Sequence, residues 1–315
     1  MLVAIIMFCV GLLLLYFGAE YLVNGSSSLA LSFGIRPLII GMTVVAFATS
    51  MPELMVSLLA VGKDSSDIAV GNIIGSNIVN IGLILGISAL LVPLRVQRSF
   101  LKRELPFMLL ATAVLWVLCQ DQVISRIDAS VLLTLLVFFI YYCLKTARLG
   151  GSNQPLPQQT VERQKSSRRR DWLYIIVGIV GLGFGADWMV GSAVFMARNF
   201  GLSELFIGTT IVALGTSLPE LAASITSVAK GETDIGIGNV VGSNIFNILF
   251  VLGVTPLLNP IAVEPSLLRF ELPVLMFFSV VLLPLSWHRY ELGRVKGGFL
   301  LGGYVLFILA LLYWK

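Results

Sequence analysis

The sequence predicts an all-α membrane protein with ten transmembrane helices, arranged as two inverted-topology repeats of five helices each. Three observations lead to this prediction: the composition, the number of long apolar runs, and a repeat that relates the two halves of the chain. The 315 residues have a mean hydropathy of +0.95, and 57% of them are hydrophobic while only 12% are charged. Soluble domains carry about 25% charged residues, so this composition is typical of an integral membrane protein.

Apolar runs of the length that a bilayer requires occur along the whole chain. They predict helices at residues 3–31, 37–62, 67–92, 104–120 and 127–146, and then at 172–198, 204–229, 234–259, 267–287 and 297–314. The first run is longer than the core of a signal peptide and follows no basic segment, so we expect a retained span. We therefore predict a first repeat at 1–146 and a second at 172–315, joined by a basic linker at 147–171.

The two halves repeat each other at a constant spacing of 167 positions. The segment Thr49–Glu53 (TSMPE) returns as Thr216–Glu220 (TSLPE), and Gly71–Asn80 returns as Gly238–Asn247. Because five is an odd number of spans, the second copy must enter the bilayer from the opposite side. Inverted repeats of this kind are typical of secondary transporters, whose substrates bind near the middle of the membrane.

Basic residues collect on one side of the predicted bilayer. The loops after spans 1, 3, 5, 7 and 9 hold sixteen of the 21 Lys and Arg residues. The opposite side holds Lys63, Arg126, Arg198, Arg269 and Lys315. The positive-inside rule therefore places the linker in the cytoplasm and both termini outside. Orientation explains the net charge of +4, and we expect no nucleic-acid partner.

The imidazole and thiol content argues against a mechanism that needs a buried His base or a His-rich metal site. The chain has one histidine, His288, and its cysteines, Cys9, Cys119 and Cys143, are isolated within apolar runs. These cysteines have no paired spacing and are interpreted as small buried hydrophobic residues.

Each repeat brings hard oxygen ligands together at a proline. Pro52 removes the helical partner of the Ala48 carbonyl, and a bare carbonyl in lipid must meet protein, water or an ion. Thr49 and Ser50 lie one turn before Glu53, on its side of the helix. Carboxylate, hydroxyl and carbonyl oxygens are the ligands that Ca²⁺ and similar cations prefer. The alternative is a structural buried acid with a basic partner.

The next helix of each repeat carries a polar stripe with a member at every fourth position. The stripe consists of Asn72, Ser76 and Asn80 in the first repeat and of Asn239, Ser243 and Asn247 in the second. These side chains are candidate ligands for the same cation. The alternative is that the asparagines hold neighbouring helices together and that the glycines beside them serve only helix packing.

The other acidic residues in or near the spans are expected to have supporting roles. Asp67 and Asp234 begin helices, where capping explains them. Supporting, gating or interfacial positions are expected for Glu20, Asp187, Glu104 and Glu271.

These paired motifs resemble the two α-repeats of the calcium/cation antiporter superfamily, in its sodium/calcium exchanger-like, bacterial inner-membrane branch. The matching segments run from Gly41 to Asn80 and from Gly208 to Asn247, and ten spans with a cytoplasmic central loop also match. The resemblance implies a transporter, not an enzyme. It implies exchange of Ca²⁺ for Na⁺ or H⁺ by alternating access in the inner membrane, with the transported ions as the only bound groups.

The resemblance also implies a role for each candidate residue. Glu53 and Glu220 are expected to chelate Ca²⁺, and Asn80 and Asn247 to complete the central ring of ligands. Ligands shared by Ca²⁺ and Na⁺ are expected at Thr49, Thr216 and the carbonyls of Ala46 and Ala213. Flanking Na⁺ sites are expected at Ser50, Ser76, Ser217 and Ser243. The two long helices at 3–31 and 172–198 are expected to slide over this core, with bending at Gly18 and Gly185.

One position departs from the family pattern and leaves the coupling ion open. Sodium/calcium exchangers commonly have an Asp where this chain has Asn247, so the centre holds only two acids. Because buried carboxylates can titrate, a cation/H⁺ antiporter with the same site is an alternative. An intramembrane hydrolase using Glu53 and Glu220, or a channel, are further alternatives, but mirrored ligands and inverted repeats favour the antiporter. The oligomeric state is not predicted.

Overall fold

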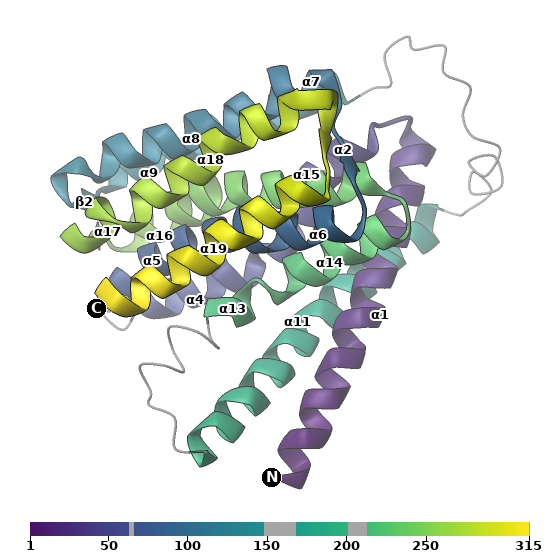
Figure 1. Cartoon of the computed structure of the whole chain (residues 1–315), viewed down its shortest axis with the longest axis horizontal. Coiled ribbons are helices and arrows are strands. Elements are labelled where there is room, and N and C mark those ends of the chain that lie inside the picture. Colours follow the sequence, from purple (N-terminus) through teal and green to yellow (C-terminus); the bar gives the residue numbers. More distant parts are fainter. Residues whose placement is uncertain (63–65, 148–167, 201–212, 315) are drawn as a thin grey trace. The chain divides into compact units, whose positions relative to one another are not determined.

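A computed structural model describes residues 1–62, 66–147, 168–200 and 213–314 of the chain (Figure 1). The chain divides into two compact units, and each takes residues from both halves of the sequence. Unit 1 comprises Met1–Thr49 and Cys143–Asn239, and unit 2 comprises Ser50–Tyr142 and Val240–Lys315. The units therefore do not follow the two sequence repeats, which stay a prediction. One boundary between the units falls inside the repeated motif, between Thr49 and Ser50.

The structure confirms the prediction of a mainly helical fold with helices of membrane-spanning length. Within the described residues, nine helical stretches are long and apolar enough to cross a membrane. They are Leu2–Phe33, Pro37–Val61, Ala69–Leu91, Arg98–Asp121, Arg126–Thr146, Arg168–Met196, Thr233–Leu258, Pro265–Tyr290 and Arg294–Leu311. The remaining predicted span, at 204–229, begins in residues that lie outside the described part of the chain.

Unit 1 is built around two long helices that are equivalent in the two repeats. These are α1 (Leu2–Phe33) and α11 (Arg168–Asn199), which lie side by side (Figure 1). The first half of the chain adds α2 (Pro37–Ile40), the π-helix η1 (Gly41–Val45) and α3 (Ala46–Thr49). The second half adds α13 (Ala213–Thr216), α14 (Leu218–Ala229) and the first part of α15 (Thr233–Phe246).

Glycines bring α1 and α11 into backbone contact. A Cβ atom added to Gly18 would lie 2.7 Å from the amide nitrogen of Leu182, and one added to Gly185 would lie 2.7 Å from that of Leu15. Gly11 meets Gly185, while Gly25 meets the backbone of Asp171, so the two helices run antiparallel. Gly18 and Gly185 lie inside uninterrupted helices, and the structure gives them a role in close packing where the sequence suggested bending.

Unit 2 contains the rest of both repeats. From the first half come α4 (Met51–Val61), α5 (Ser66–Ile78), the π-helix η2 (Val79–Ile84), α6 (Leu85–Leu91), α7 (Arg98–Lys102), α8 (Glu104–Leu118), the 3₁₀ turn η3 (Cys119–Asp121) and most of α9 (Arg126–Thr146). From the second half come the end of α15, the π-helix η5 (Asn247–Val251), α16 (Leu252–Leu258), α17 (Pro265–Arg269), α18 (Glu271–Trp287), the 3₁₀ turn η6 (His288–Tyr290) and α19 (Arg294–Trp314). Helix α8 packs against its equivalent α18, and α19 packs against α6 and η2.

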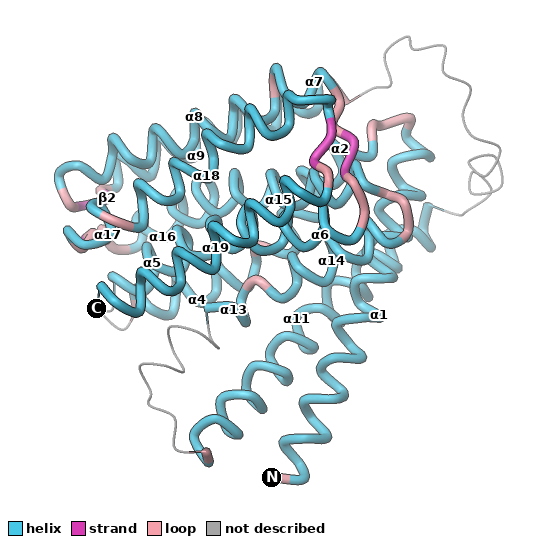
Figure 2. Tube along the Cα trace, viewed as in Figure 1, coloured by secondary structure: helices cyan, strands magenta, loops and turns pink. Residues whose placement is uncertain are grey.

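Four short strands, which the sequence did not predict, tie the loops of unit 2 together. Strand β1 (Leu94–Arg95) pairs with β4 (Glu291–Leu292), and β2 (Val123–Ile124) pairs with β3 (Ile261–Ala262), both antiparallel. Figure 2 shows the two pairs at opposite ends of the long helices of this unit. The first pair joins the loops after predicted spans 3 and 9, and the second joins those after spans 4 and 8. These are the loops that an inverted repeat assigns to a common side.

Candidate cation-binding site

Both repeated motifs interrupt a helix at the position that the prolines predict. Ser50 separates α3 from α4 with φ −81° and ψ 2°, and Ser217 separates α13 from α14 with φ −88° and ψ 7°. In each case the proline occupies the second position of the helix that follows, where its missing N–H costs no helical hydrogen bond. The break exposes backbone groups that a continuous helix would satisfy internally.

The two motif acids are completely buried and stand in equivalent places. Glu53 lies in the first turn of α4, Glu220 lies in the first turn of α14, and each is 0% exposed. The N-terminus of a helix stabilises negative charge, which lowers the cost of burying a carboxylate there. Glu53 belongs to unit 2 and Glu220 to unit 1.

In unit 1, Asn239 connects three segments of the candidate site. Its Nδ2 donates to the Ser224 hydroxyl at 2.9 Å and to the Glu220 carbonyl at 3.3 Å. Its Oδ1 accepts from the Thr49 hydroxyl at 3.2 Å, and the same hydroxyl lies 3.3 Å from the Ala46 carbonyl. Asn239 therefore holds α14, α15 and α3 together, which is the helix-joining role that the sequence offered as the alternative to cation binding.

In unit 2, four buried asparagines form crossed hydrogen bonds between the two repeats. Asn80 Nδ2 donates to Asn244 Oδ1 at 3.1 Å, and Asn247 Nδ2 donates to Asn77 Oδ1 at 3.0 Å. Since Asn77 and Asn80 are the repeat equivalents of Asn244 and Asn247, exchanging the repeats converts one bond into the other. We call these four residues the asparagine quartet. The sequence indicated Asn80 and Asn247 as ligands but assigned no role to Asn77 and Asn244.

Several buried oxygens of the predicted site have no hydrogen-bond partner within the part of the chain that the structure describes. They are the hydroxyls of Ser50, Ser76 and Ser217 and the Oδ1 atoms of Asn80 and Asn247. Buried polar atoms are normally satisfied, and each exception calls for a water, an ion or a functional explanation. All five are hard oxygen atoms of the kind that bind Na⁺ or Ca²⁺.

For the remaining predicted ligands, the structure gives the burial of the side chain or the helix to which the residue belongs. Ser243 and Thr216 are buried, while Asn72 is half-buried in α5. Ala213 begins α13, and its side chain lies outside the described part of the structure.

Short π-helical segments contain the last residues of both polar stripes. The segment η2 contains Asn80 in its first turn, and η5 begins at Asn247. A π-helical turn widens the helix and rotates the side chains that follow, and such turns are frequent at functional sites. Periodicity counted at every fourth residue could not have revealed this rotation.

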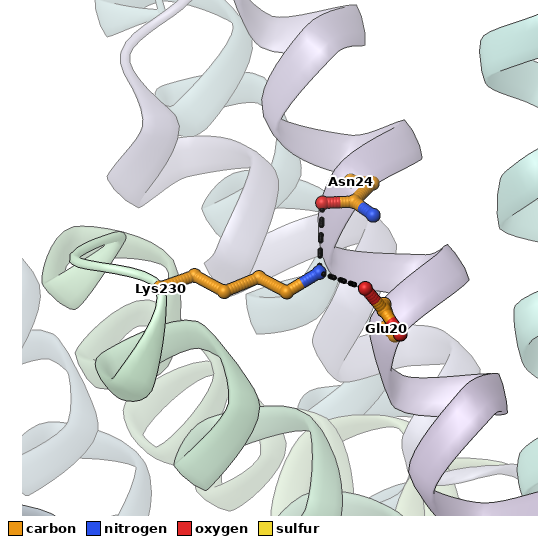
Figure 3. Close-up of polar contacts among 3 residues, drawn as sticks. All are labelled: Glu20, Asn24 and Lys230. Atoms are coloured by element: carbon orange, nitrogen blue, oxygen red, sulfur yellow. Dashed lines mark hydrogen bonds and ion pairs between the residues drawn. The ribbon is translucent and has the colours of Figure 1, made fainter.

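Two acids, one in α1 and one in the segment after α14, take part in hydrogen bonds that join these two parts. Figure 3 shows Lys230, which follows α14, bonded to Glu20 Oε1 and Asn24 Oδ1 of α1, each at 3.0 Å. Nearby along the chain, Glu232 accepts from the Ser27 hydroxyl at 2.8 Å. Glu20 therefore bonds to a lysine outside the repeated motif, and its supporting role stays a prediction.

The other acids of the spans lie mostly at helix starts. Glu104 and Glu271 are buried in the first turns of α8 and α18, and Asp234 is half-buried in the first turn of α15. Asp187 is exposed. Asp67 lies in α5, but its side chain is outside the described residues.

Among the described residues, no three His, Cys, Asp or Glu side chains lie together in a group that could hold a metal ion. The predicted ligand set does not depend on such a group, because it combines two acids with hydroxyl, amide and backbone oxygens.

Comparisons with known proteins agree with the architecture. A family model described as "Sodium/calcium exchanger protein" matches residues 3–145 and again residues 170–313. The chain is 41% identical to the inner membrane protein YrbG of Escherichia coli (strain K12), over 100% of this chain and 98% of that protein. It is 30% identical to the sodium/calcium exchanger MaX1 of Methanosarcina acetivorans, over 96% of this chain and 97% of that protein. The solved structure of the sodium-calcium exchanger NCX_Mj superposes with a TM-score of 0.87 and 32% identity, over 98% of this chain and 99% of that chain.

Proposed function

The chain belongs to the sodium/calcium exchanger protein family, a family of transporters and not of enzymes, and from this premise we propose that it exchanges Ca²⁺ for Na⁺ by alternating access. The transported ions are its substrates, and they bind in turn at one site that both repeats supply. The relative from E. coli is named an inner membrane protein, which supports the same location for this chain.

The observation that carries the proposal is the buried acid of each broken helix. Glu53 and Glu220 are fully buried in a chain whose helices are apolar enough to cross a membrane, and each stands beside a helix interruption and buried hydroxyls. Acids within membrane spans are costly and usually mark an ion pathway. Two carboxylates neutralise one divalent cation, which is the charge balance that a Ca²⁺ site requires.

The inverted repeat is part of the proposal, with halves at 1–146 and 172–315. The antiparallel packing of α1 against α11 supports it, because equivalent helices of an inverted repeat run in opposite directions. The strand pairs β1–β4 and β2–β3 support it as well, since they join loops that share a side in this topology. The loops after predicted spans 1, 3, 5, 7 and 9 hold sixteen of the 21 Lys and Arg residues. We therefore place both termini outside and the linker at 147–171 in the cytoplasm.

Each predicted ligand takes a role in this scheme. We assign Ca²⁺ binding to Glu53, Glu220, Asn80 and Asn247, with oxygens shared between Ca²⁺ and Na⁺ at Thr49, Thr216 and the carbonyls of Ala46 and Ala213. The flanking Na⁺ sites use the hydroxyls of Ser50, Ser76, Ser217 and Ser243. Asn72 and Asn239 support these ligands. For Asn239, this role is supported by its bonds to Thr49, Ser224 and the Glu220 carbonyl.

Coupling follows from the charge of the two acids. A site that faces neither side of the membrane is surrounded by apolar protein, where two bare carboxylates are strongly disfavoured. The transporter therefore changes its orientation only when cations neutralise the acids. Because Ca²⁺ and Na⁺ compete for the same oxygens, one ion must leave before the other binds, which produces exchange and not leak.

Substitution of either acid by its amide tests the proposal. Glu53→Gln and Glu220→Gln keep the size of the side chain and remove its charge, so each variant is expected to insert normally and to lose Na⁺-driven Ca²⁺ flux in proteoliposomes. Glu264→Gln, which changes an exposed acid ahead of α17, serves as the control and should keep the flux. Near-normal exchange in either motif variant would remove the proposed site.

A cation/H⁺ antiporter is a second candidate, favoured by the amides at Asn80 and Asn247. With no third acid at these positions, two titrating carboxylates suffice to exchange one divalent cation for protons. Ca²⁺ uptake into vesicles should be driven by an imposed Na⁺ gradient at constant pH if Na⁺ is the coupling ion. Uptake driven by a pH gradient without Na⁺ would instead assign the protein to proton coupling.

A further inference from the structure

The asparagine quartet divides into two residues with an unused oxygen and two residues whose oxygens are used. Asn80 and Asn247 donate through Nδ2, and their buried Oδ1 atoms have no hydrogen-bond partner within the described residues. Asn244 and Asn77 accept those bonds through their own Oδ1 atoms. The pairs are therefore not interchangeable: one pair presents unused oxygens, and the other fixes the amides that carry them.

The orientation of an amide decides whether it attracts or repels a cation. A carboxamide has an oxygen that accepts or coordinates and an NH₂ group that only donates. Rotation by half a turn about the last side-chain bond exchanges the two groups with almost no change in shape. An amide that serves as a cation ligand consequently needs a partner that engages its NH₂ group and leaves the oxygen available.

We propose that Asn77 and Asn244 are positioning residues that lock the amides of Asn247 and Asn80 with their oxygens toward the transported cation. This inference deepens the proposed function and rests on it, because it takes Asn80 and Asn247 as ligands. Asn77 and Asn244 do not touch the ion. They act by accepting the NH₂ hydrogen bonds at 3.0 and 3.1 Å.

The two positioning residues are themselves held in place. Asn77 Nδ2 donates to the backbone carbonyl of Asn244 at 3.2 Å, so its Oδ1 faces Asn247. Asn244 Nδ2 lies 3.6 Å from Met108 Sδ, a weak acceptor on α8, so its Oδ1 faces Asn80. All four side chains are at most 1% exposed, which excludes bulk water as a substitute partner. The whole arrangement lies in unit 2 and joins α5 and η2 to the end of α15 and η5.

The arrangement also explains why this chain needs orienting residues at all. A carboxylate has two equivalent oxygens and coordinates a cation from either face, so an Asp ligand requires no such lock. An amide ligand at the same position does require one. The quartet is therefore the consequence of having Asn at both 80 and 247.

The test removes one acceptor and asks whether its importance depends on the residue that it orients. Asn244→Leu keeps the approximate volume and removes the acceptor for Asn80 Nδ2. We expect the Ca²⁺ KM of exchange in proteoliposomes to rise about tenfold, the equivalent of one hydrogen bond to a buried amide, while the maximal rate changes little. The repeat-equivalent variant Asn77→Leu should act in the same direction through Asn247.

The decisive measurement repeats Asn244→Leu in an Asn80→Asp background. With two equivalent oxygens at position 80, the loss of the orienting acceptor should no longer raise the Ca²⁺ KM. The same cancellation is expected for Asn77→Leu in an Asn247→Asp background. Met108→Leu removes only the sulfur contact of Asn244, and because that contact is weak this variant is expected to raise the Ca²⁺ KM by less than Asn244→Leu does.

The outcomes separate the inference from the proposed function. If Asn244→Leu raises the Ca²⁺ KM equally with and without the Asn80→Asp substitution, the quartet is merely structural and the inference is wrong, although exchange by the unchanged protein still stands. If the unchanged protein exchanges no Ca²⁺, the proposed function itself fails. Should Asn244→Leu not fold, Asn244→Ala removes the same acceptor with a smaller side chain, and the same cancellation is required of it.

Discussion

The α1–α11 interface of unit 1 and the asparagine quartet of unit 2 both join the two repeats, the first by close backbone packing and the second by hydrogen bonds. Each joins equivalent residues of the two repeats so that exchanging the repeats reproduces the contact. At the interface, Gly18 and Gly185 allow backbone to approach backbone, with hypothetical Cβ contacts of 2.7 Å. In the quartet, Nδ2 groups meet Oδ1 atoms at 3.0 and 3.1 Å.

The interface depends on side-chain volume, whereas the quartet depends on the direction of its hydrogen bonds. The glycine contact depends on the absence of a side chain, so it requires small volume at particular positions but no particular donor or acceptor. The quartet depends on which atom donates and which accepts, and a small shift would break its bonds. In the proposed mechanism α1 and α11 move while the ligands stay fixed, and the contrast between the two contacts predicts opposite sensitivities to substitution.

The largest expected effect is at the glycine contact. Gly18→Leu would force a side chain against the backbone of Leu182 and Gly181, which cannot move aside as a side chain can. Overpacking of a core typically costs about 1–3 kcal/mol, and contact with backbone lies at the upper end. We expect a clearly lower Tm in detergent and loss of exchange in proteoliposomes.

The control for that experiment lies on the same helix pair. Gly183 of α11 is exposed, and an added Cβ would meet nothing within 4 Å. Gly183→Leu should leave exchange unchanged and should not lower the Tm, since replacing a helical glycine with a better helix former stabilises a helix by up to about 1 kcal/mol. If both substitutions behaved alike, close approach would not be what the glycines provide.

A smaller effect is expected where volume is kept and direction is lost. Asn239→Leu has nearly the same size but leaves the Thr49 hydroxyl, the Ser224 hydroxyl and the Glu220 carbonyl without this partner. A buried polar group left unsatisfied costs about 1–3 kcal/mol, so the Tm should fall and exchange should weaken. Asn199→Leu, at an exposed amide whose Nδ2 donates to the carbonyl of Phe195 in the same helix, is the control. If the Asn239→Leu protein were as stable as the control, the hydrogen bonds of Asn239 would not contribute to stability.

How far the sequence predicted the fold depends on which features are local. The length of apolar runs and the spacing of 167 residues are readable along the chain, so nine of the predicted spans have counterparts among the described residues. The strand pair of Leu94 with Leu292 was missed because tertiary pairing and not local propensity creates it. The short helix α7 just ahead of the fourth span was missed as well. Likewise, the spacing of apolar and polar residues does not predict the π-helix that begins at Val79.

The candidate site shows the same limit at the scale of single residues. Glu53 and Glu220 stood out because a buried acid is rare in an apolar run. Asn77 and Asn244 are repeated just as faithfully, but each lies one position beyond a serine of the polar stripe and so faces another direction on an ideal helix. Only their crossed bonds reveal what they do. The repeat itself was the available signal, since it retains both asparagines where packing alone would accept apolar residues.

The smallest effect is expected at a contact that is directional but partly exposed. Lys230 bonds to Glu20, with side-chain exposures of 26% and 35%, and such pairs contribute about 0–1 kcal/mol. Lys230→Met should therefore lower the Tm by a few degrees at most. High salt should reduce this difference in Tm between the variant and the unchanged protein, because salt screens exposed charges. The double variant Glu20→Lys with Lys230→Glu restores opposite charges and should recover whatever the single changes lose.

A weak pair is what a moving α1 requires, since a contact that must break in each transport cycle adds its full strength to the barrier. If Lys230→Met cost more than about 2 kcal/mol, beyond the range of exposed pairs, the Lys230 segment would fix α1 in place, and the contrast between a mobile helix pair and a fixed asparagine quartet would be lost.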